Sequence, residues 1–138
     1  MFQPAKTKYR KWHRLRNTES KVATSGTQLS FGSFGLKATT GGEINSRQLE
    51  AARKVLSRSA GKLGKIWIRV FPDRPFTQKA AEVGMGKGKG DPQGYCVQVR
   101  PGRMLFEIDG VSEAVAKEGL RKAGTKLPVK IKIISREA

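Results

Sequence analysis

Apolar residues recur at helical spacing between residues 49 and 63, and this pattern constrains the fold of the chain more than any other. The residues in register are Leu49, Ala52, Leu56, Ala60 and Leu63. Such spacing places them on one face of a helix. Asn45 and Gln48 precede them in the spacing of a capping box, and Gly64 is the expected terminator. The other faces carry cations, so we predict a helix with one buried stripe under a basic surface.

Segments with the alternating pattern of strands lie on both sides of this helix. Residues 27–39, TQLSFGSFGLKAT, alternate around Gly32 and Ser33. This predicts two short strands, or one bent strand with a bulge at the glycine. Residues 65–73, KIWIRVFPD, alternate in the same way until Pro72 interrupts the strand.

Further strands are expected in the second half of the chain. Residues 95–100, YCVQVR, and 103–108, RMLFEI, flank Pro101 and Gly102. Two such runs around a Pro-Gly turn predict a β-hairpin. Residues 129–134, VKIKII, alternate apolar residues with lysines and predict a final strand.

A second helix is expected to begin after Ser112 as its N-cap and to stop at Pro128. Its apolar residues are Val115, Leu120, Ala123 and Leu127. The order of elements predicts a single α+β domain over residues 27–138, without internal repeats. A long loop, residues 73–94, is expected to protrude from it. Residues 1–26 show no regular apolar spacing and are interpreted as a basic N-terminal arm.

The charge of the chain points to a polyanionic partner. Its 28 Lys and Arg against 11 Asp and Glu give a net charge of +17. A compact chain with this charge repels itself unless a polyanion neutralises it; a merely soluble basic protein is the alternative. In the arm, Tyr9 and Trp12 lie among the cations, where they either stack on bases or anchor the arm. A solvated tail is the alternative for the whole arm.

Several classes of protein are excluded by the sequence. No window approaches about 18 consecutive apolar residues, so we expect no membrane span. The N-terminus lacks the apolar region of a secretory signal. The chain has one cysteine, Cys96, and one histidine, His13, which leaves no disulfide framework and no zinc cluster. We therefore expect an intracellular protein without a cofactor.

The stretch VGMGKGKGDPQG, residues 83–94, resembles a phosphate-binding loop only in composition. No register supplies the spacing of a P-loop or of a dinucleotide fingerprint. In an extended chain Lys87 and Lys89 point to the same side, and the intervening glycines allow the backbone to approach a phosphate or a base closely. The stretch therefore favours a loop that reaches an anionic partner; a flexible linker is the alternative.

Enzymatic activity has no support in the residue pattern. Cys96 is expected in a strand and His13 in the arm, which separates the two members of a potential nucleophile pair. Glu107 and Asp109 flank a turn, where they more plausibly solubilise the surface or pair with lysines. We therefore expect no small-molecule substrate. We predict that the chain binds RNA or DNA mainly through contacts with the phosphate backbone of the nucleic acid.

Five segments occur in a characteristic order, namely SFGSFGLKA, SRQLEAAR, GKIWIRVFPD, MGKGKG and RPGRMLFEIDGV. Together with the start QPAKTKYRK they resemble the bacterial-type large-subunit ribosomal protein sixteen family over essentially the whole chain. The resemblance implies an α+β fold of the α/β-hammerhead type, shared with archaeal and eukaryotic counterparts. It also implies large-subunit ribosomal RNA as partner, A-site and possibly P-site transfer RNA near the peptidyl-transferase region, and neighbouring ribosomal proteins.

By position, the candidate RNA-binding residues are cations of the arm, the first helix and the segment after it. They are Lys6, Lys8, Arg10, Lys11, Arg14, Arg16, Arg47, Arg53, Lys54, Arg58, Arg69 and Arg74. The loop that faces transfer RNA would contribute Lys79, Gly86, Lys87, Gly88, Lys89 and Gly90. A free-standing RNA chaperone or ribosome assembly factor is the alternative function.

Two positions depart from the pattern of the family. Many members have an arginine, hydroxylated in some, where this chain has Gly84. We expect no such modification here and a looser end of the loop. The strand after the loop often begins Tyr-Trp, whereas this chain has Tyr95 and Cys96, so neighbouring residues must replace the packing of the indole.

Overall fold

The computed structural model describes residues 2–11, 21–78 and 88–136. These residues form seven strands and two helices. In chain order they are β1 (Phe34–Ala38), β2 (Gly42–Asn45), α1 (Ser46–Ala60), β3 (Lys65–Ile68), β4 (Arg74–Gln78), β5 (Asp91–Val99), β6 (Met104–Asp109), α2 (Glu113–Gly124) and β7 (Ile131–Ser135).

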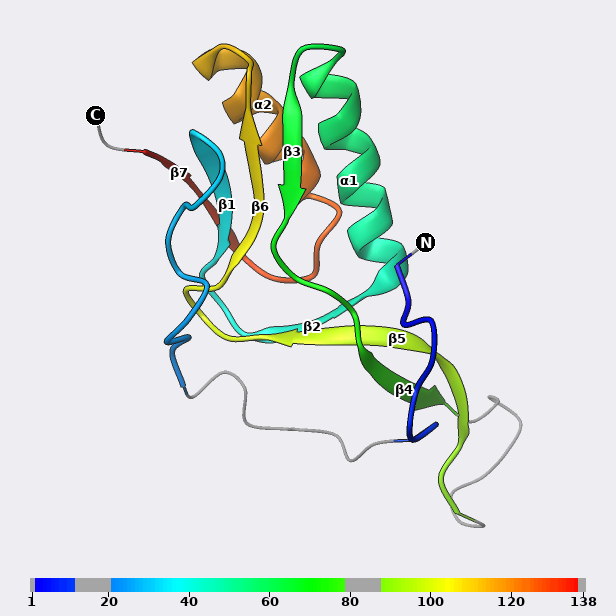
Figure 1. Ribbon diagram of the computed structural model, residues 1–138. Helices are drawn as coiled ribbons and strands as arrows, with labels where there is room; N and C mark the ends of the chain where they lie inside the picture. The colour runs from blue at the N-terminus through cyan, green and yellow to red at the C-terminus, as the bar shows by residue number, and fades with distance from the viewer. Residues whose placement is uncertain (1, 12–20, 79–87, 137–138) are drawn as a thin grey trace.

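The strands form two sheets, and every pair of neighbouring strands is antiparallel. One sheet has the order β3-β6-β1-β7, and the other has the order β2-β5-β4. Both helices pack against the four-stranded sheet, and the three-stranded sheet runs across one end of it (Figure 1). The predicted α+β class is confirmed.

The hydrophobic core lies between the two helices and the four-stranded sheet. Leu36 of β1, Leu56 of α1, Phe106 of β6 and Leu120 of α2 are all completely buried. Burial of each such side chain contributes about 1.5–3 kcal/mol, so these contacts stabilise the packing of the helices on the sheet.

The start of α1 was predicted correctly and its end was not. The Gln48 backbone N–H donates to Asn45 Oδ1 at 2.9 Å, and the Asn45 N–H donates to Gln48 Oε1 at 3.0 Å, which completes the capping box. The helix ends at Ala60 because Gly61, with φ of 64°, leaves the helical conformation. Leu63 consequently lies outside the buried stripe and is 88% exposed.

The second helix has the predicted N-cap, Ser112, whose Oγ accepts a hydrogen bond from the Val115 N–H. It ends at Gly124, four residues before Pro128. Val115 is 43% exposed, whereas its neighbour Ala116 is completely buried. The buried stripe is therefore displaced by one residue at the start of this helix.

The predicted hairpin is wrong. The β5 strand pairs with β2 and β4, whereas β6 pairs with β1 and β3, so the Pro101–Gly102 turn joins two different sheets. The partner that displaces β6 from β5 is β2, the short segment GEIN that the sequence analysis did not recognise as a strand. A turn sequence between two strands shows that the chain reverses there, but it does not show which strands pair with each other.

Strands also occupy both ends of the predicted protruding loop. Arg74 is paired in register with Cys96, and Gln78 with Asp91, so β4 and β5 form a two-stranded ribbon at the base of the loop. Pro75 is tolerated in β4 because this strand lies at the edge of its sheet. The strand predicted over residues 65–73 ends at Ile68 instead.

The segment before β1 is partly bound to the domain. The Ala23 N–H donates to the Pro101 carbonyl at 2.9 Å, and the Gly26 carbonyl accepts from the Met104 N–H at 2.7 Å. Near the N-terminus, Phe2 packs against the core. Of the strands expected over residues 27–39, β1 is the one present. The boundary between arm and domain at residue 26 stays a prediction.

Candidate nucleic-acid interface

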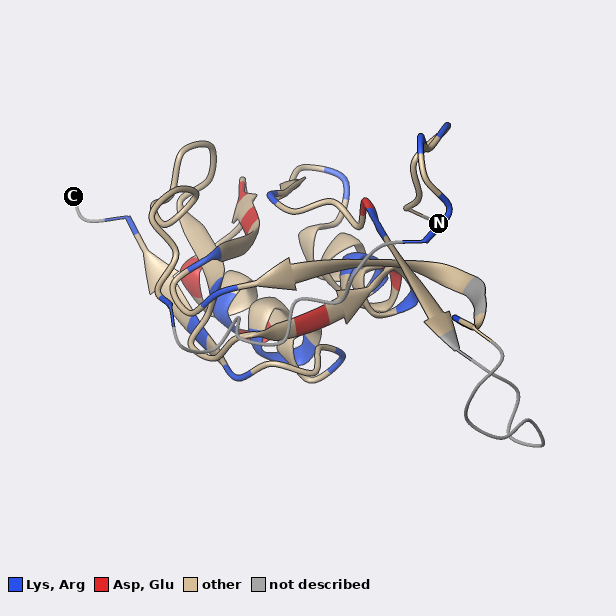
Figure 2. Ribbon diagram, turned by 90° about the horizontal axis from the view of Figure 1, so that it is seen from below, with Lys and Arg blue, Asp and Glu red and all other residues tan. Residues whose placement is uncertain are grey.

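Lysines and arginines cover the helices, strands and connecting segments, and acids are fewer (Figure 2). Seven of the predicted RNA-binding cations are exposed. They are Lys6, Lys8, Arg10 and Lys11 of the N-terminal segment and Arg47, Lys54 and Arg58 of α1. The basic surface predicted for α1 is therefore present, and the cations nearest the N-terminus lie in water.

The N-terminal segment lies close to the end of the β4–β5 ribbon. Lys11 Nζ donates a hydrogen bond to the Lys89 carbonyl at 3.1 Å, which joins residues 78 positions apart. Tyr9, 61% exposed, has Lys8 Nζ at 5.5 Å from its ring centroid. We call Lys6, Lys8, Arg10, Lys11 and Lys89 the N-terminal basic cluster. Two segments that the sequence analysis treated separately, the arm and the loop, are thus brought together.

Gly88 follows a backbone path that favours glycine. Its φ is 88°, and a Cβ added there would meet no atom within 4 Å. The glycine is therefore required by the backbone conformation and not by packing. Gly90 lies in the same described part of the loop. The predicted residues Arg14, Arg16, Lys79, Gly86 and Lys87 lie outside the described residues, as do Trp12, His13 and Gly84.

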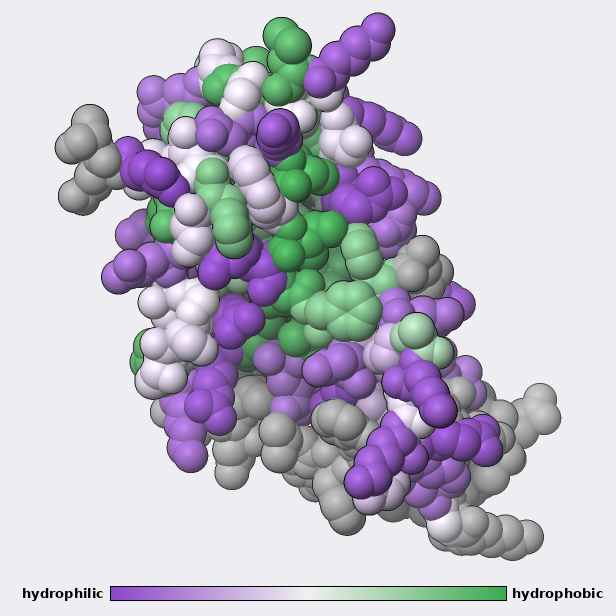
Figure 3. All heavy atoms as spheres, viewed as in Figure 1, coloured by the Kyte–Doolittle hydropathy of each residue, from purple (hydrophilic) through white to green (hydrophobic). Residues whose placement is uncertain are grey.

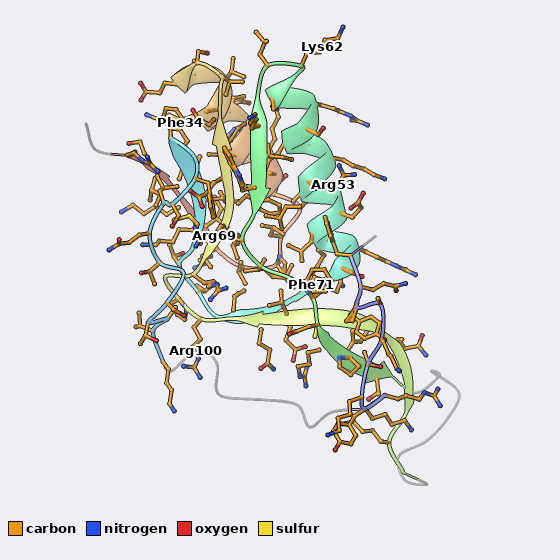
Figure 4. The ribbon with its side chains drawn as sticks, in the orientation of Figure 1. Phe34, Arg53, Lys62, Arg69, Phe71 and Arg100 are labelled. Atoms are coloured by element: carbon orange, nitrogen blue, oxygen red, sulfur yellow. The ribbon has the colours of Figure 1, made fainter. Side chains whose placement is uncertain are left out.

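Arg69 has an internal role in place of the predicted one. Its Nη1 forms an ion pair with Glu107 Oε2 and donates to the Gln28 carbonyl at 3.2 Å. The guanidinium lies over the ring of Phe31, 5.3 Å from its centroid, and Phe31 stacks on Trp67. In Figure 4, Arg69 lies over the four-stranded sheet, whereas Arg53 lies on α1. We therefore assign Arg69 to the scaffold.

Glu107 accepts more hydrogen bonds than its ion pair alone provides. Its Oε1 accepts the backbone N–H groups of Ser30, Phe31 and Gly32 at 2.9–3.0 Å. Burial raises the pKa of this carboxyl group, but the three N–H groups and Arg69 together outweigh burial and hold the pKa below its ordinary value. We call Glu107, Arg69 and residues 30–32 the carboxylate latch.

Only glycine fits at position 32 of the carboxylate latch. A Cβ on Gly32 would lie 2.7 Å from the Ile108 carbonyl oxygen, which is closer than real Cβ atoms approach. The segment before β1 can therefore come close enough to β6 for its N–H groups to reach Glu107. The expectation that Glu107 lies at the surface is wrong, since its side chain is fully buried.

Arg74 is likewise internal. It is 6% exposed, and its Nη1 donates to Glu43 Oε1 at 3.1 Å and to Cys96 Sγ at 3.4 Å. Arg74 therefore ties the edge strand β4 to the other strands of the sheet. Cys96 is buried beside it.

Arg53 has an intermediate position. It is one-third exposed and binds Glu50 through two hydrogen bonds, from Nε at 3.1 Å and from Nη2. The hydrogen bond from Arg53 lowers the pKa of Glu50, despite the opposing effect of burial. Arg53 can therefore face a phosphate only with the remaining N–H groups, or after leaving Glu50.

The predicted candidates for chemistry are structural where the chain is described. Asp109 Oδ1 accepts from Ser33 Oγ at 2.9 Å and from the Gly110 N–H at 2.8 Å, and these hydrogen bonds lower the pKa of its carboxyl group. Within residues 2–11, 21–78 and 88–136, no three metal-binding side chains gather. No helix in this part of the chain is long and apolar enough to cross a membrane.

Sequence reasoning missed two surface grooves. One, of about 570 Å³, lies at the junction of the two sheets and is lined by Phe2, Ile68, Arg69, Val70, Phe71, Asp73, Val97 and Arg103. Figure 3 shows apolar residues in the middle of this face, with hydrophilic residues around them. The other, of about 330 Å³, lies between α1 and α2. Each groove combines residues from separate elements, so no local sequence signal reveals it.

Comparison with known proteins identifies the family of this chain. The family described as "Ribosomal protein L16p/L10e" matches residues 4–134. A relative named "Large ribosomal subunit protein uL16" from Halorhodospira halophila is 55% identical over 136 residues, which cover 99% of this chain and 98% of the relative. A protein of the same name from Polaromonas naphthalenivorans is 52% identical over 136 residues, 99% of this chain and 97% of the relative.

Proposed function

Because the chain belongs to the ribosomal protein L16p/L10e family, we propose that its N-terminal basic cluster and the exposed cations of α1 bind large-subunit ribosomal RNA. The chain is a structural constituent of the large ribosomal subunit and not an enzyme. Its partners are ribosomal RNA and neighbouring ribosomal proteins, and its place is on the ribosome. We further propose that the protruding loop contacts transfer RNA in the A site.

The observation that carries this proposal is the hydrogen bond from Lys11 Nζ to the Lys89 carbonyl. This hydrogen bond places lysines of the N-terminal segment beside Lys89 of the loop. Gathering like charges costs free energy unless an anion lies between or beside them. A ribosomal RNA backbone supplies closely spaced phosphates that suit such a cluster.

The exposed cations of α1 provide a second surface. Arg47, Lys54 and Arg58 are separated by seven and four residues, so they lie along one face of the helix. The opposite face is the buried stripe that packs on the sheet. Since the core fixes α1 rigidly, its cations are presented in a constant arrangement, which suits contact with a folded RNA.

The proposal is tested first by sedimentation of an epitope-tagged copy of the full chain, followed by a high-salt wash of the large-subunit peak. Near-stoichiometric retention is expected of a ribosomal constituent. Release in the wash, or sedimentation with precursor particles alone, would instead indicate an assembly factor that cycles on and off. Absence from all ribosomal fractions would contradict both functions.

Contact with transfer RNA is tested separately, because it depends on the loop. The variant Lys87→Ala/Lys89→Ala is expected to enter large subunits at normal occupancy but to slow accommodation of transfer RNA on purified ribosomes. The matched control is Lys130→Ala/Lys132→Ala, which removes the same charge at exposed positions near β7. Equal defects in occupancy and accommodation would show that the loop lacks a separate role.

A further inference from the structure

The groove between α1 and α2 is lined mainly by basic and hydroxyl side chains, and no acid is among its lining residues. Its lining consists of Val55, Arg58 and Ser59 from α1 and Lys122, Thr125 and Lys126 from α2 and the turn after it. Three of these six residues are cations, and Val55 is the sole apolar member. Val55 and the aliphatic stems of the lysines and the arginine form much of the groove surface. The three charged ends of these side chains are groups that bind phosphate.

The groove lies beside a close contact between the two helices, which pack against each other through the core. A Cβ on Gly119 would lie 2.8 Å from the Cβ of Ser59, so the helices are in their closest contact there. They run antiparallel (Figure 1). Lys122, about one turn after Gly119 on α2, and Val55, about one turn before Ser59 on α1, both line the groove. The close contact at Gly119 therefore borders the groove.

The cations of the groove are available to a ligand. Within the part of the chain that is described, the side chains of Arg58 and Lys126 have no ion-pair or hydrogen-bond partner, and both residues are exposed. Lys122 Nζ lies 3.9 Å from Glu118 Oε1, but that carboxylate is already bound by Arg121 at 2.6 Å. The three side chains thus bring positive charge to one place, and only Lys122 of the three has an acidic partner among the described residues, which it shares with Arg121.

The end of α2 accounts for only part of this arrangement. Lysines near the C-terminus of a helix favourably meet its partial negative charge, which explains Lys122 and Lys126 without any ligand. Arg58 lies in the last turn of α1 and meets the partial negative charge of that helix in the same way. This effect does not require cations of two different helices to line one groove, as Arg58, Lys122 and Lys126 do, whereas a shared anion accounts for that arrangement.

We propose that the α1–α2 groove binds a phosphodiester segment of ribosomal RNA, as a site separate from the N-terminal basic cluster. This inference rests on the proposed function. The volume of about 330 Å³ suits one or two phosphates, and the absence of an aromatic residue among the six lining residues favours the RNA backbone over a stacked base. Arg58 supplies a planar pair of donors, and the lysines supply point charges.

The test compares two triple variants with the same loss of charge. Arg58→Gln/Lys122→Gln/Lys126→Gln removes the groove cations, and Lys62→Gln/Lys130→Gln/Lys132→Gln removes three exposed lysines elsewhere. Binding of each full chain to protein-free large-subunit ribosomal RNA is measured between 50 and 200 mM salt. The slope of log affinity against log salt should fall by about one to two in magnitude for the groove variant, and by less for the control.

A charge-preserving variant, Arg58→Lys/Lys122→Arg/Lys126→Arg, should restore most of the slope. Equal falls for the two charge-removing variants would overturn the groove as a site while leaving RNA binding intact. If the groove variant binds free RNA normally but leaves intact subunits at lower salt, the groove holds an acidic protein segment and the RNA proposal is wrong. Failure of the unmodified chain to bind the RNA would instead overturn the proposed function, and this inference with it.

Discussion

The four-stranded sheet with its helices and the N-terminal basic cluster use arginine and lysine in opposite ways. In the first region, the buried Glu107 holds Arg69 and three backbone N–H groups. In the second, the cations Lys6, Lys8, Arg10 and Lys11 lie in water. The comparison teaches that the few acids of a highly basic chain can be concentrated where they stabilise the fold, which leaves the outer cations for an anionic partner.

The sharpest test of this division is removal of the buried carboxylate. Glu107→Ala leaves the Arg69 guanidinium and the N–H groups of residues 30–32 without their acceptor. Breaking a buried pair of this kind costs about 3–5 kcal/mol, so we expect the free energy of unfolding to fall by that amount in urea denaturation. Glu113→Gln, at an exposed position at the start of α2, should change it by less than about 0.5 kcal/mol.

A loss of unfolding free energy below about 1 kcal/mol for Glu107→Ala would mean that the hydrogen bonds of the carboxylate latch contribute little to stability. The separation of the two regions by the use of their charges would then be wrong. Glu107→Gln is a useful intermediate, since its amide oxygen can still accept some of the N–H groups while the charge is lost. We expect the stability of Glu107→Gln to lie between that of Glu107→Ala and that of the unmodified protein.

Low pH should destabilise the four-stranded sheet and its helices through protonation of Glu107. The pKa of Glu107 is lowered in the folded protein, so its charged form contributes stability above the ordinary pKa of 4.5 that is lost as pH falls through the folded value. Stability should therefore decline below about pH 4.5, and Glu107→Gln should show a shallower decline. Asp109, Glu50, Glu113 and Glu118 also have lowered pKa values and account for the remainder. If the stability of the unmodified protein and that of Glu107→Gln declined in parallel as the pH falls, Glu107 would not contribute to the loss of stability in acid.

Substitutions in the N-terminal basic cluster should affect RNA binding and leave stability nearly unchanged, in contrast to substitution of Glu107. Lys11→Met/Lys89→Met removes two exposed charges and the hydrogen bond between the segments. We expect unfolding free energy to change by less than about 0.5 kcal/mol, whereas the salt slope of binding to large-subunit ribosomal RNA should fall by about two in magnitude. The matched control Lys130→Met/Lys132→Met should change the slope less. A clear loss of stability, with RNA binding unchanged, would make this cluster part of the scaffold.

The sequence predicted those parts of the fold that depend on neighbours along the chain. The capping box of α1 and the N-cap Ser112 were read correctly because their hydrogen bonds span only three residues. The partner of β5 was not, because β2 lies about fifty residues earlier and carries no pattern stronger than that of β6. Local patterns report propensity, and pairing between distant segments is decided by the packing of the whole domain.

The same limit applies to the candidate site. Charge identified the cations of the N-terminal segment and α1, but it could not separate Arg58, which is exposed, from Arg69 and Arg74, which pair with buried or half-buried acids. Nor could it reveal that Lys122 and Lys126 share a groove with Arg58. A cation's role depends on which acid the fold brings to it, and that acid lies 38 residues away for Arg69 and 31 for Arg74.

Arg53 provides the finest test, because it lies between the two regions in behaviour: it is partly exposed yet bound to Glu50. If Arg53 contacts RNA, Glu50→Gln should release it and strengthen binding by about twofold, since a helical pair at this spacing is worth only about 0.2–0.5 kcal/mol. Glu113→Gln serves as control, because it removes the same charge from α2. An equal gain in affinity for both variants would show that only net charge changed, and Arg53 would then belong with Arg69 and Arg74 among the arginines that serve the scaffold.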